Sequence, residues 1–272
     1  MLSLDVNGYA MPYIALGHGP ALVAIHGSLG DFRSWSPVMG LLSRDRRLII
    51  PSLRHFFPDS WDGKAATYTI DQHTSDIIAF IEGLGLGPVD LMGHSRGGHI
   101  AFRAAEQRPD LIKRLILAEP GGELDETLQP AGTRPSAERN DSNIAAARLI
   151  SGGDADGGLR IFVDRINGDG TWDKRPPAYQ QMRRDNAHTL VGQLTEARRP
   201  LSRASAQSIK PQTLLIGGEE TKGQLPIVLQ ALAGAIPKSR VAMIPMASHN
   251  MFEQSPVRFA ALVTEFLADN RT

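Results

Sequence analysis

Short apolar runs recur along the chain and alternate with longer segments of helical periodicity. The runs are candidates for buried strands and occupy residues 22–25, 48–50, 89–92, 115–118, 213–216 and 241–244. Segments 70–84 and 256–267 carry apolar residues at helical spacing. Buried strands separated by amphipathic helices are typical of α/β folds. The pattern therefore predicts a mostly parallel central sheet with helices on both faces.

The alternation stops between residues 121 and 207. Segments 143–150, 159–167, 177–186 and 189–197 have helical character and are separated by glycine- and proline-containing breaks. The strand pattern before this stretch resumes after it, so a separate domain is disfavoured. The prediction is a core made of residues 1–120 and 208–272, with a helical cap inserted as residues 121–207.

The most informative segment is Gly-His-Ser-Arg-Gly at residues 93–97, which fits the pattern G-x-S-x-G. An apolar run precedes it, and a helical pattern rich in glycine and alanine follows. A strand, sharp turn and helix in this order form a nucleophile elbow, which exposes a serine hydroxyl on a strained turn. This context favours Ser95 as a nucleophile over a glycine- and serine-rich loop without chemistry.

A serine nucleophile needs a base and a site for the developing oxyanion. His249 follows the last predicted strand and a short loop, which places it at the sheet edge where Ser95 is expected. The turn after the first long strand offers the backbone N–H of Ser28, and Arg96, next to the nucleophile, offers a second. We therefore predict Ser95 and His249 as catalytic residues and these two N–H groups as the oxyanion hole.

Three motifs in this order resemble those of the α/β-hydrolase superfamily. They are His26-Gly27 after a strand, the elbow at 93–97, and Ala247-Ser248-His249 before the last helix. The resemblance covers nearly the whole chain and implies a cap domain like those of esterases, lactonases and C–C bond hydrolases. It identifies the superfamily and leaves the substrate open.

The chain departs from this family at the carboxylate that would orient His249. Many members carry an aspartate after the penultimate strand, where Thr221 stands here. Threonine cannot stabilise an imidazolium as a carboxylate does. Glu119 directly follows a buried strand, where an unpaired charge is costly, and resembles the glutamate acid of some haloalkane dehalogenases. We predict Glu119 as the acid that orients His249, with Glu219 and Glu220 as alternatives. If Glu119 has no catalytic role, we expect it to form an ion pair with an arginine of the cap.

The amino-acid composition limits the kinds of partner that this protein is expected to bind. Lys+Arg and Asp+Glu both number 29, which gives no reason to expect nucleic acid or an anionic membrane. There are no cysteines, which excludes disulfides and thiolate metal sites. The first residues lack the features of a signal peptide, and no apolar run is long enough to span a membrane. The expectation is a cytoplasmic monomer or homodimer that acts on a small molecule without a cofactor or metal.

The resulting prediction is a capped serine hydrolase. Ser95 attacks a small or medium carboxylic ester or lactone, His249 transfers the proton, and water releases the acyl-enzyme. Two alternatives stay open: other chemistry on this fold, such as C–C bond hydrolysis or cofactor-free oxygenation, and a hydrolase-derived ligand-binding protein. A haloalkane dehalogenase is disfavoured because its nucleophile is an aspartate.

Overall fold

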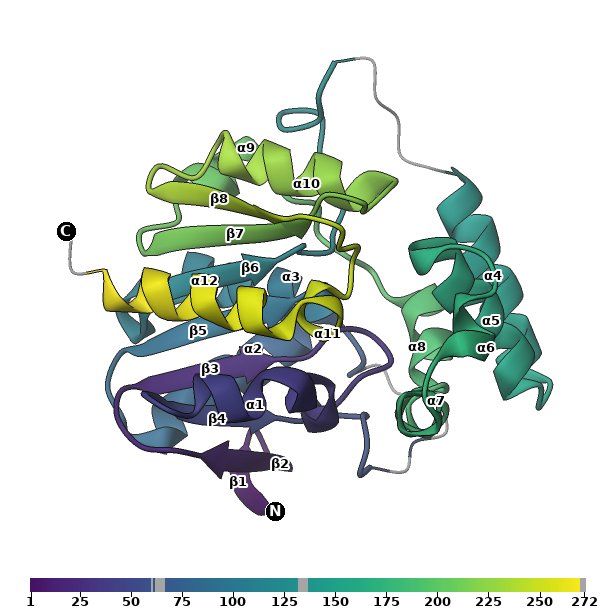
Figure 1. Ribbon diagram of the computed structural model, residues 1–272, viewed down its shortest axis with the longest axis horizontal. Coiled ribbons are helices and arrows are strands. Elements are labelled where there is room, and N and C mark those ends of the chain that lie inside the picture. The colour runs from purple at the N-terminus through teal and green to yellow at the C-terminus, as the bar shows by residue number, and fades with distance from the viewer. Residues whose placement is uncertain (60, 62–66, 132–136, 270–272) are drawn as a thin grey trace.

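One eight-stranded sheet organises the protein (Figure 1). The computed structural model describes residues 1–59, 61, 67–131 and 137–269. In spatial order the strands run β1, β2, β4, β3, β5, β6, β7 and β8. Their bounds are β1 Leu2–Val6, β2 Tyr9–Leu16, β3 Ala21–Ile25, β4 Arg47–Pro51, β5 Val89–His94, β6 Ile112–Ala118, β7 Gln212–Gly218 and β8 Ser239–Ile244. The pairs from β4 to β8 are parallel, which confirms the predicted mostly parallel sheet.

The antiparallel edge of the sheet lies outside the elements predicted from the sequence. Strands β1 and β2 form a hairpin, and β2 also pairs antiparallel with β4. Val6 pairs with Tyr9, so Asn7 and Gly8 make a two-residue turn, with φ of 53° and 72°. Asn-Gly is the common sequence for such a turn because both positions need positive φ. The Asn7-Gly8 dipeptide is therefore the sequence signal from which this hairpin could have been predicted.

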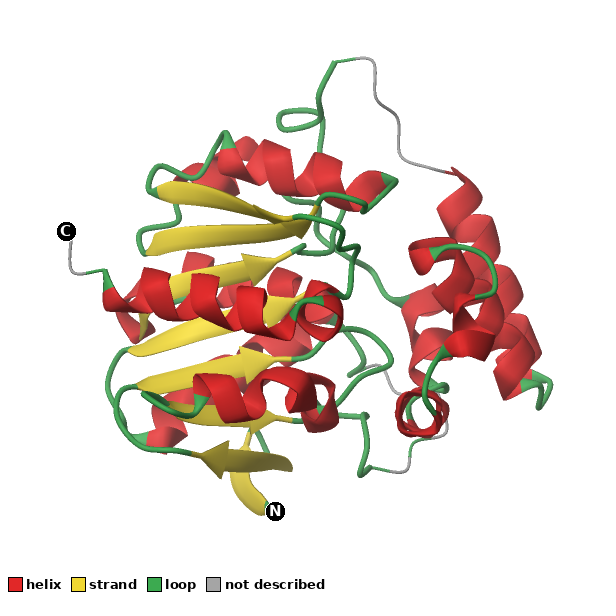
Figure 2. Cartoon of the chain, in the orientation of Figure 1, coloured by secondary structure: helices red, strands yellow, loops and turns green. Residues whose placement is uncertain are grey.

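Helices cover both faces of the sheet, as predicted (Figure 2). One face packs against α1 Ser36–Leu42, α11 Met251–Gln254 and α12 Pro256–Ala268. The other packs against α2 Ile70–Leu84, α3 Arg96–Gln107, α9 Arg203–Gln207 and α10 Gln224–Ala233. Two short 3-10 helices occupy Phe32–Trp35 and Pro109–Leu111.

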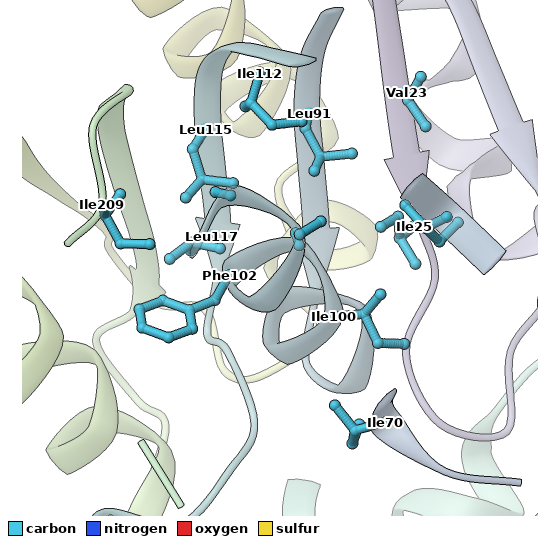
Figure 3. Close-up of a cluster of buried hydrophobic side chains, with 14 of the residues drawn as sticks. Val23, Ile25, Ile70, Leu91, Ile100, Phe102, Ile112, Leu115, Leu117 and Ile209 are labelled. Atoms are coloured by element: carbon cyan, nitrogen blue, oxygen red, sulfur yellow. The ribbon is translucent and has the colours of Figure 1, made fainter. Parts of the chain in front are cut away.

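Alternate residues of the buried strands enter different cores. In β3, Val23 and Ile25 face the helices of α2 and α3, whereas Leu22 and Ala24 face α1 and α12. Figure 3 shows Val23 and Ile25 in the core that includes residues of α2 and α3. Successive side chains of a strand point to opposite faces, so a run that is apolar throughout requires cover on both.

Six described helices lie between β6 and β7; α9 packs on the sheet, and the other five form a group of their own. These five are α4 Ala137–Ser151, α5 Ala155–Asn167, α6 Thr171–Lys174, α7 Pro177–Asp185 and α8 Thr189–Thr195. Figure 1 shows helices α4 to α8 grouped beyond the carboxyl ends of the parallel strands. Their own buried cluster includes Leu159, Val163 and Trp172, together with Leu29 from the loop after β3. Of the segment 121–207, residues 132–136 lie outside the part of the chain that is described.

Candidate active site

The turn between β5 and α3 holds Ser95 in a strained conformation. Its φ is 52° and its ψ is −116°, outside the common regions for a residue with a side chain. The backbone is fixed on both sides: the N–H of Ser95 donates to the carbonyl of Ala118 at 3.0 Å, and the N–H of Gly121 donates to the carbonyl of Ser95 at 2.8 Å. Strain of this kind persists only where the surroundings enforce it.

The two glycines of the elbow are required by close backbone approach. A Cβ on Gly93 would lie 2.1 Å from the carbonyl oxygen of Gly97. A Cβ on Gly97 would lie 2.4 Å from the carbonyl oxygen of Ile25, in the neighbouring strand. Both contacts are with backbone atoms that cannot rotate away. The motif spacing seen in the sequence therefore has a steric cause.

His249 and Glu119 form a buried pair. His249 Nδ1 donates to Glu119 Oε2 at 2.7 Å, and the Glu119 side chain is fully buried. The second carboxylate oxygen, Oε1, accepts from the backbone N–H of Gly218 at 2.9 Å. With its proton on Nδ1, a neutral His249 imidazole leaves Nε2 free to accept another. This arrangement fixes both the ring orientation and its tautomer.

The two other candidate acids lie elsewhere. Glu219 and Glu220 are exposed, and their backbone N–H groups donate to the carbonyls of Ile244 and Ala247. Thr221 is buried, and its hydroxyl has no partner among the described residues. The end of β7 thus supplies a backbone N–H to the carboxylate of Glu119 and brings no carboxylate of its own to His249 in the described structure.

His94 supports the loop that carries His249. Its Nε2 donates to the carbonyl of His249 at 2.9 Å, and the two rings lie 4.4 Å apart. Burial lowers the pKa of His94 well below its ordinary value, and the neighbouring His249 acts in the same direction. His94 is therefore neutral, and its position suits a packing role beneath Ser95.

The turn after β3 is held by hydrogen bonds from several elements. His26 Nδ1 donates to the carbonyl of Gly27 at 2.9 Å, and its Nε2 accepts from the N–H of Leu53 at 3.1 Å. Burial lowers the pKa of His26 to about 4, so the ring is neutral, as this bonding pattern requires. Arg183 from α7 donates to the carbonyl of Ser28 at 3.2 Å.

Arg96 uses its backbone and its side chain differently. As the first residue of α3, it has an N–H without an intrahelical acceptor. Its guanidinium forms hydrogen bonds of 2.6 and 2.8 Å with Glu196, donates to His73 Nδ1 at 3.0 Å, and lies over the ring of Tyr68. The side chain therefore connects α3 to the segment that follows α8.

Two cavities adjoin Ser95. The larger has a volume of about 290 Å³ and the smaller about 40 Å³. Both are lined by Ser95, His249 and Ser28 from the core and by Phe162 and Ile166 from α5. Ser95 thus borders both cavities. A reacting bond placed there would have one substituent on each side.

Within the ranges described above, no three His, Cys, Asp or Glu side chains are placed to hold a metal ion. In the same ranges, no helix has the length and apolar character needed to cross a membrane.

The family follows from a comparison with known sequences. The sequence model described as the alpha/beta hydrolase fold matches residues 20–256. The chain belongs to the alpha/beta hydrolase fold family. This confirms the resemblance inferred from the motifs. This alpha/beta hydrolase also carries the family's elbow, His-Gly turn and closing histidine in the expected order.

Relatives of this alpha/beta hydrolase include proteins of different activities. A Bacillus subtilis (strain 168) protein, provisionally named 2-succinyl-6-hydroxy-2,4-cyclohexadiene-1-carboxylate synthase, is 27% identical and covers 94% of each chain. The sn-1-specific diacylglycerol lipase ABHD11 of Mus musculus is 26% identical over 92% of this chain and 81% of its own. The enol-lactonase from Burkholderia xenovorans LB400 superposes with a TM-score of 0.79 at 22% identity, covering 98% of this chain and all of that chain.

Sequence reasoning did not single out several residues that shape this site. Gly218 contacts Glu119 through its backbone, and Arg183 contacts the turn at Ser28. Phe162 and Ile166 line both cavities. Backbone contacts carry no residue-type signal, and the residues of α5 and α7 reach the site only through tertiary packing.

Proposed function

We propose that this protein is a serine hydrolase that cleaves a small or medium carboxylic ester or lactone through an acyl-enzyme. Ser95 is the nucleophile, His249 the general base and then the general acid, and Glu119 the residue that orients the imidazole. The backbone N–H groups of Ser28 and Arg96 receive the oxyanion. Helices α4 to α8, within residues 121–207, serve as a cap over the reacting centre. No cofactor takes part in these steps.

In the first half-reaction, Ser95 Oγ attacks the carbonyl carbon while His249 Nε2 takes the hydroxyl proton. The negative charge on the carbonyl oxygen is stabilised by the two N–H donors, and the imidazolium by Glu119. The tetrahedral intermediate collapses, and His249 returns the proton to the departing alkoxide. Water, deprotonated by His249, then attacks the acyl-enzyme. As the acid leaves, His249 returns this proton to Ser95 Oγ, which regenerates the free hydroxyl.

The observation that carries this proposal is the constellation at the sheet edge. Ser95 sits on a strained turn with φ of 52° and shares both cavities with His249. The 2.7 Å hydrogen bond from His249 Nδ1 to Glu119 suits a base that must accept at Nε2. The lipase name of the mouse relative adds support for ester chemistry, since that relative aligns over 92% of this chain.

The test is formation of an acyl-enzyme at Ser95. With p-nitrophenyl butyrate, we expect a burst of p-nitrophenol. Intact-protein mass spectrometry should detect one butyryl group, and peptide mapping should place it on Ser95. Ser95→Ala should lose turnover by a factor on the order of a million and keep its fold, because removing the nucleophile removes the covalent route. Retention of more than a tenth of the activity would sink the proposal.

Ser28→Ala provides a matched control in the same pocket. Because the proposed contribution of Ser28 is its backbone N–H, losing the hydroxyl should change kcat/KM by less than about threefold. Lactone opening, followed by acid release in a pH-stat, should depend on Ser95 in the same way. If the folded wild-type protein cleaves neither esters nor lactones, the proposal is wrong. The other chemistries of this fold, such as C–C bond hydrolysis, would then be tested.

A further inference from the structure

The larger cavity has a positively charged wall. Among the residues that line it, four carry positive side chains and, in the described part of the chain, none is Asp or Glu. The four are Arg96, Arg165, Arg198 and Lys222. They come from separate parts of the fold: α3, α5, the segment after α8 and the loop after β7. The smaller cavity has one cation, Arg183, on its wall.

A nearby carboxylate offsets part of this charge. Glu196 accepts from Arg96 at 2.6 and 2.8 Å and from Arg198 Nε at 2.6 Å. Burial acts to raise the pKa of Glu196, but the two guanidinium groups outweigh it and lower this pKa, so Glu196 is ionised. One carboxylate thus faces two arginines. Lys222 is exposed at the cavity.

The wall also holds hydrogen-bond donors that lack acceptors. Arg103 Nε donates to His99 Nε2 at 3.2 Å, so the proton of the neutral His99 ring is on Nδ1. Burial lowers the pKa of His99 well below its ordinary value, which keeps the ring neutral. This Nδ1–H and the amide nitrogen of Gln193 have no partner in the described structure. Both nitrogens are inaccessible to water, and buried donors without acceptors are costly. A side-chain movement would be needed to bring them to the oxygen atoms of a ligand.

We propose that the substrate is an ester or lactone that also carries a carboxylate, and that this carboxylate binds in the larger cavity. The inference rests on the proposed ester chemistry for the reacting group and adds the charge of the substrate. A concave site lined by one sign of charge concentrates counter-ions and strengthens their binding. A carboxylate supplies several acceptor positions to donors on the wall.

Matched pairs of substrates test the charge without changing the reacting bond. The acyl-side pair is the mono-p-nitrophenyl ester of adipic acid and its terminal amide. The alcohol-side pair is 3-carboxyphenyl acetate and 3-carbamoylphenyl acetate. In at least one pair, we expect kcat/KM for the carboxylate to exceed that for the amide by about tenfold, and the preference to decrease as salt is added.

Variants of one lysine assign the preference to this cavity. Lys222→Gln should lower the carboxylate preference by about two- to fivefold, and Lys222→Arg should retain most of it. Lys210→Gln removes another exposed lysine, one that is outside the cavity wall, and it should leave the preference unchanged. Titration with adipate and with its diamide gives a binding readout that is independent of turnover, and adipate should bind more tightly.

The outcomes separate the two proposals. If the neutral members are cleaved as fast as the carboxylates, or if Lys222→Gln keeps the full preference, the inference is overturned and the ester chemistry stands. If no ester is cleaved but adipate binds in a Lys222-dependent way, the anion site stands and the ester chemistry is overturned. If neither turnover nor preferential adipate binding is found, both are overturned.

Discussion

Replacing Glu119 by glutamine is the sharpest test of the geometry around His249. The carboxylate uses one oxygen for His249 Nδ1, at 2.7 Å, and the other for the N–H of Gly218, at 2.9 Å. A glutamine has one oxygen and one NH₂ group in these places. Because Gly218 can only donate, the amide oxygen is drawn toward it, and the NH₂ group then faces His249. The imidazole must accept at Nδ1 and carry its proton on Nε2.

The expected loss follows from that tautomer. With its proton on Nε2, His249 cannot accept the proton of Ser95, and an amide cannot balance the charge of an imidazolium. The corresponding aspartate-to-asparagine change in a serine protease lowers kcat by about 10⁴, so we expect a decrease of about 10³ to 10⁴ for Glu119→Gln. This equals about 4–5.5 kcal/mol of transition-state stabilisation. Stability should change little because all the hydrogen bonds of the site remain possible.

The assay is kcat for p-nitrophenyl butyrate with thermal unfolding measured in parallel. Glu219→Gln and Glu220→Gln are matched controls, because both side chains are exposed. Each should keep kcat within about twofold of the wild type, as is usual for surface substitutions that also change stability little. A folded Glu119→Gln protein with more than a tenth of the wild-type activity would refute the reasoning. So would an inactive Glu220→Gln protein beside an active Glu119→Gln protein.

Two further predictions concern stability. Gly97→Ala should yield little folded protein, because its Cβ would lie 2.4 Å from the carbonyl oxygen of Ile25 and 2.5 Å from that of His26; a soluble variant with unchanged urea midpoint would contradict this. The pKa of His26 is lowered to about 4 by burial, so the folded state favours its neutral form. Its stabilising contribution is complete above pH 6.5 and is lost as the pH falls toward 4, about 3 kcal/mol in all. Urea unfolding should therefore show stability decreasing by at least about 1 kcal/mol between pH 6.5 and 5.5, and a flat profile over that range would be the contrary result.

Much of the fold and the family could be predicted from local sequence patterns. Runs such as Leu22–Ile25 are apolar at every position, which requires cover on both faces of a sheet and so predicts helices on both sides. The hairpin of β1 and β2 was missed although Asn7-Gly8 marks its turn, because Pro12 interrupts the second strand and weakens its signal. The elbow was predictable because backbone sterics impose its glycines at fixed spacing around Ser95.

The sequence by itself determined the α/β architecture, the family, and the candidates Ser95 and His249, because each rests on short local motifs and on their order along the chain. Tertiary structure decided which carboxylate meets His249. Glu119 and the exposed Glu219 and Glu220 all follow strand ends, and only the register of β6 beside β7, with φ of 39° at Glu119, directs one of them inward. It also decided the charge of the larger cavity. The sequence has 29 Lys and Arg residues and 29 Asp and Glu residues, so its composition gives no sign of this positive charge. The cations on the cavity wall come from four distant segments that only folding brings together.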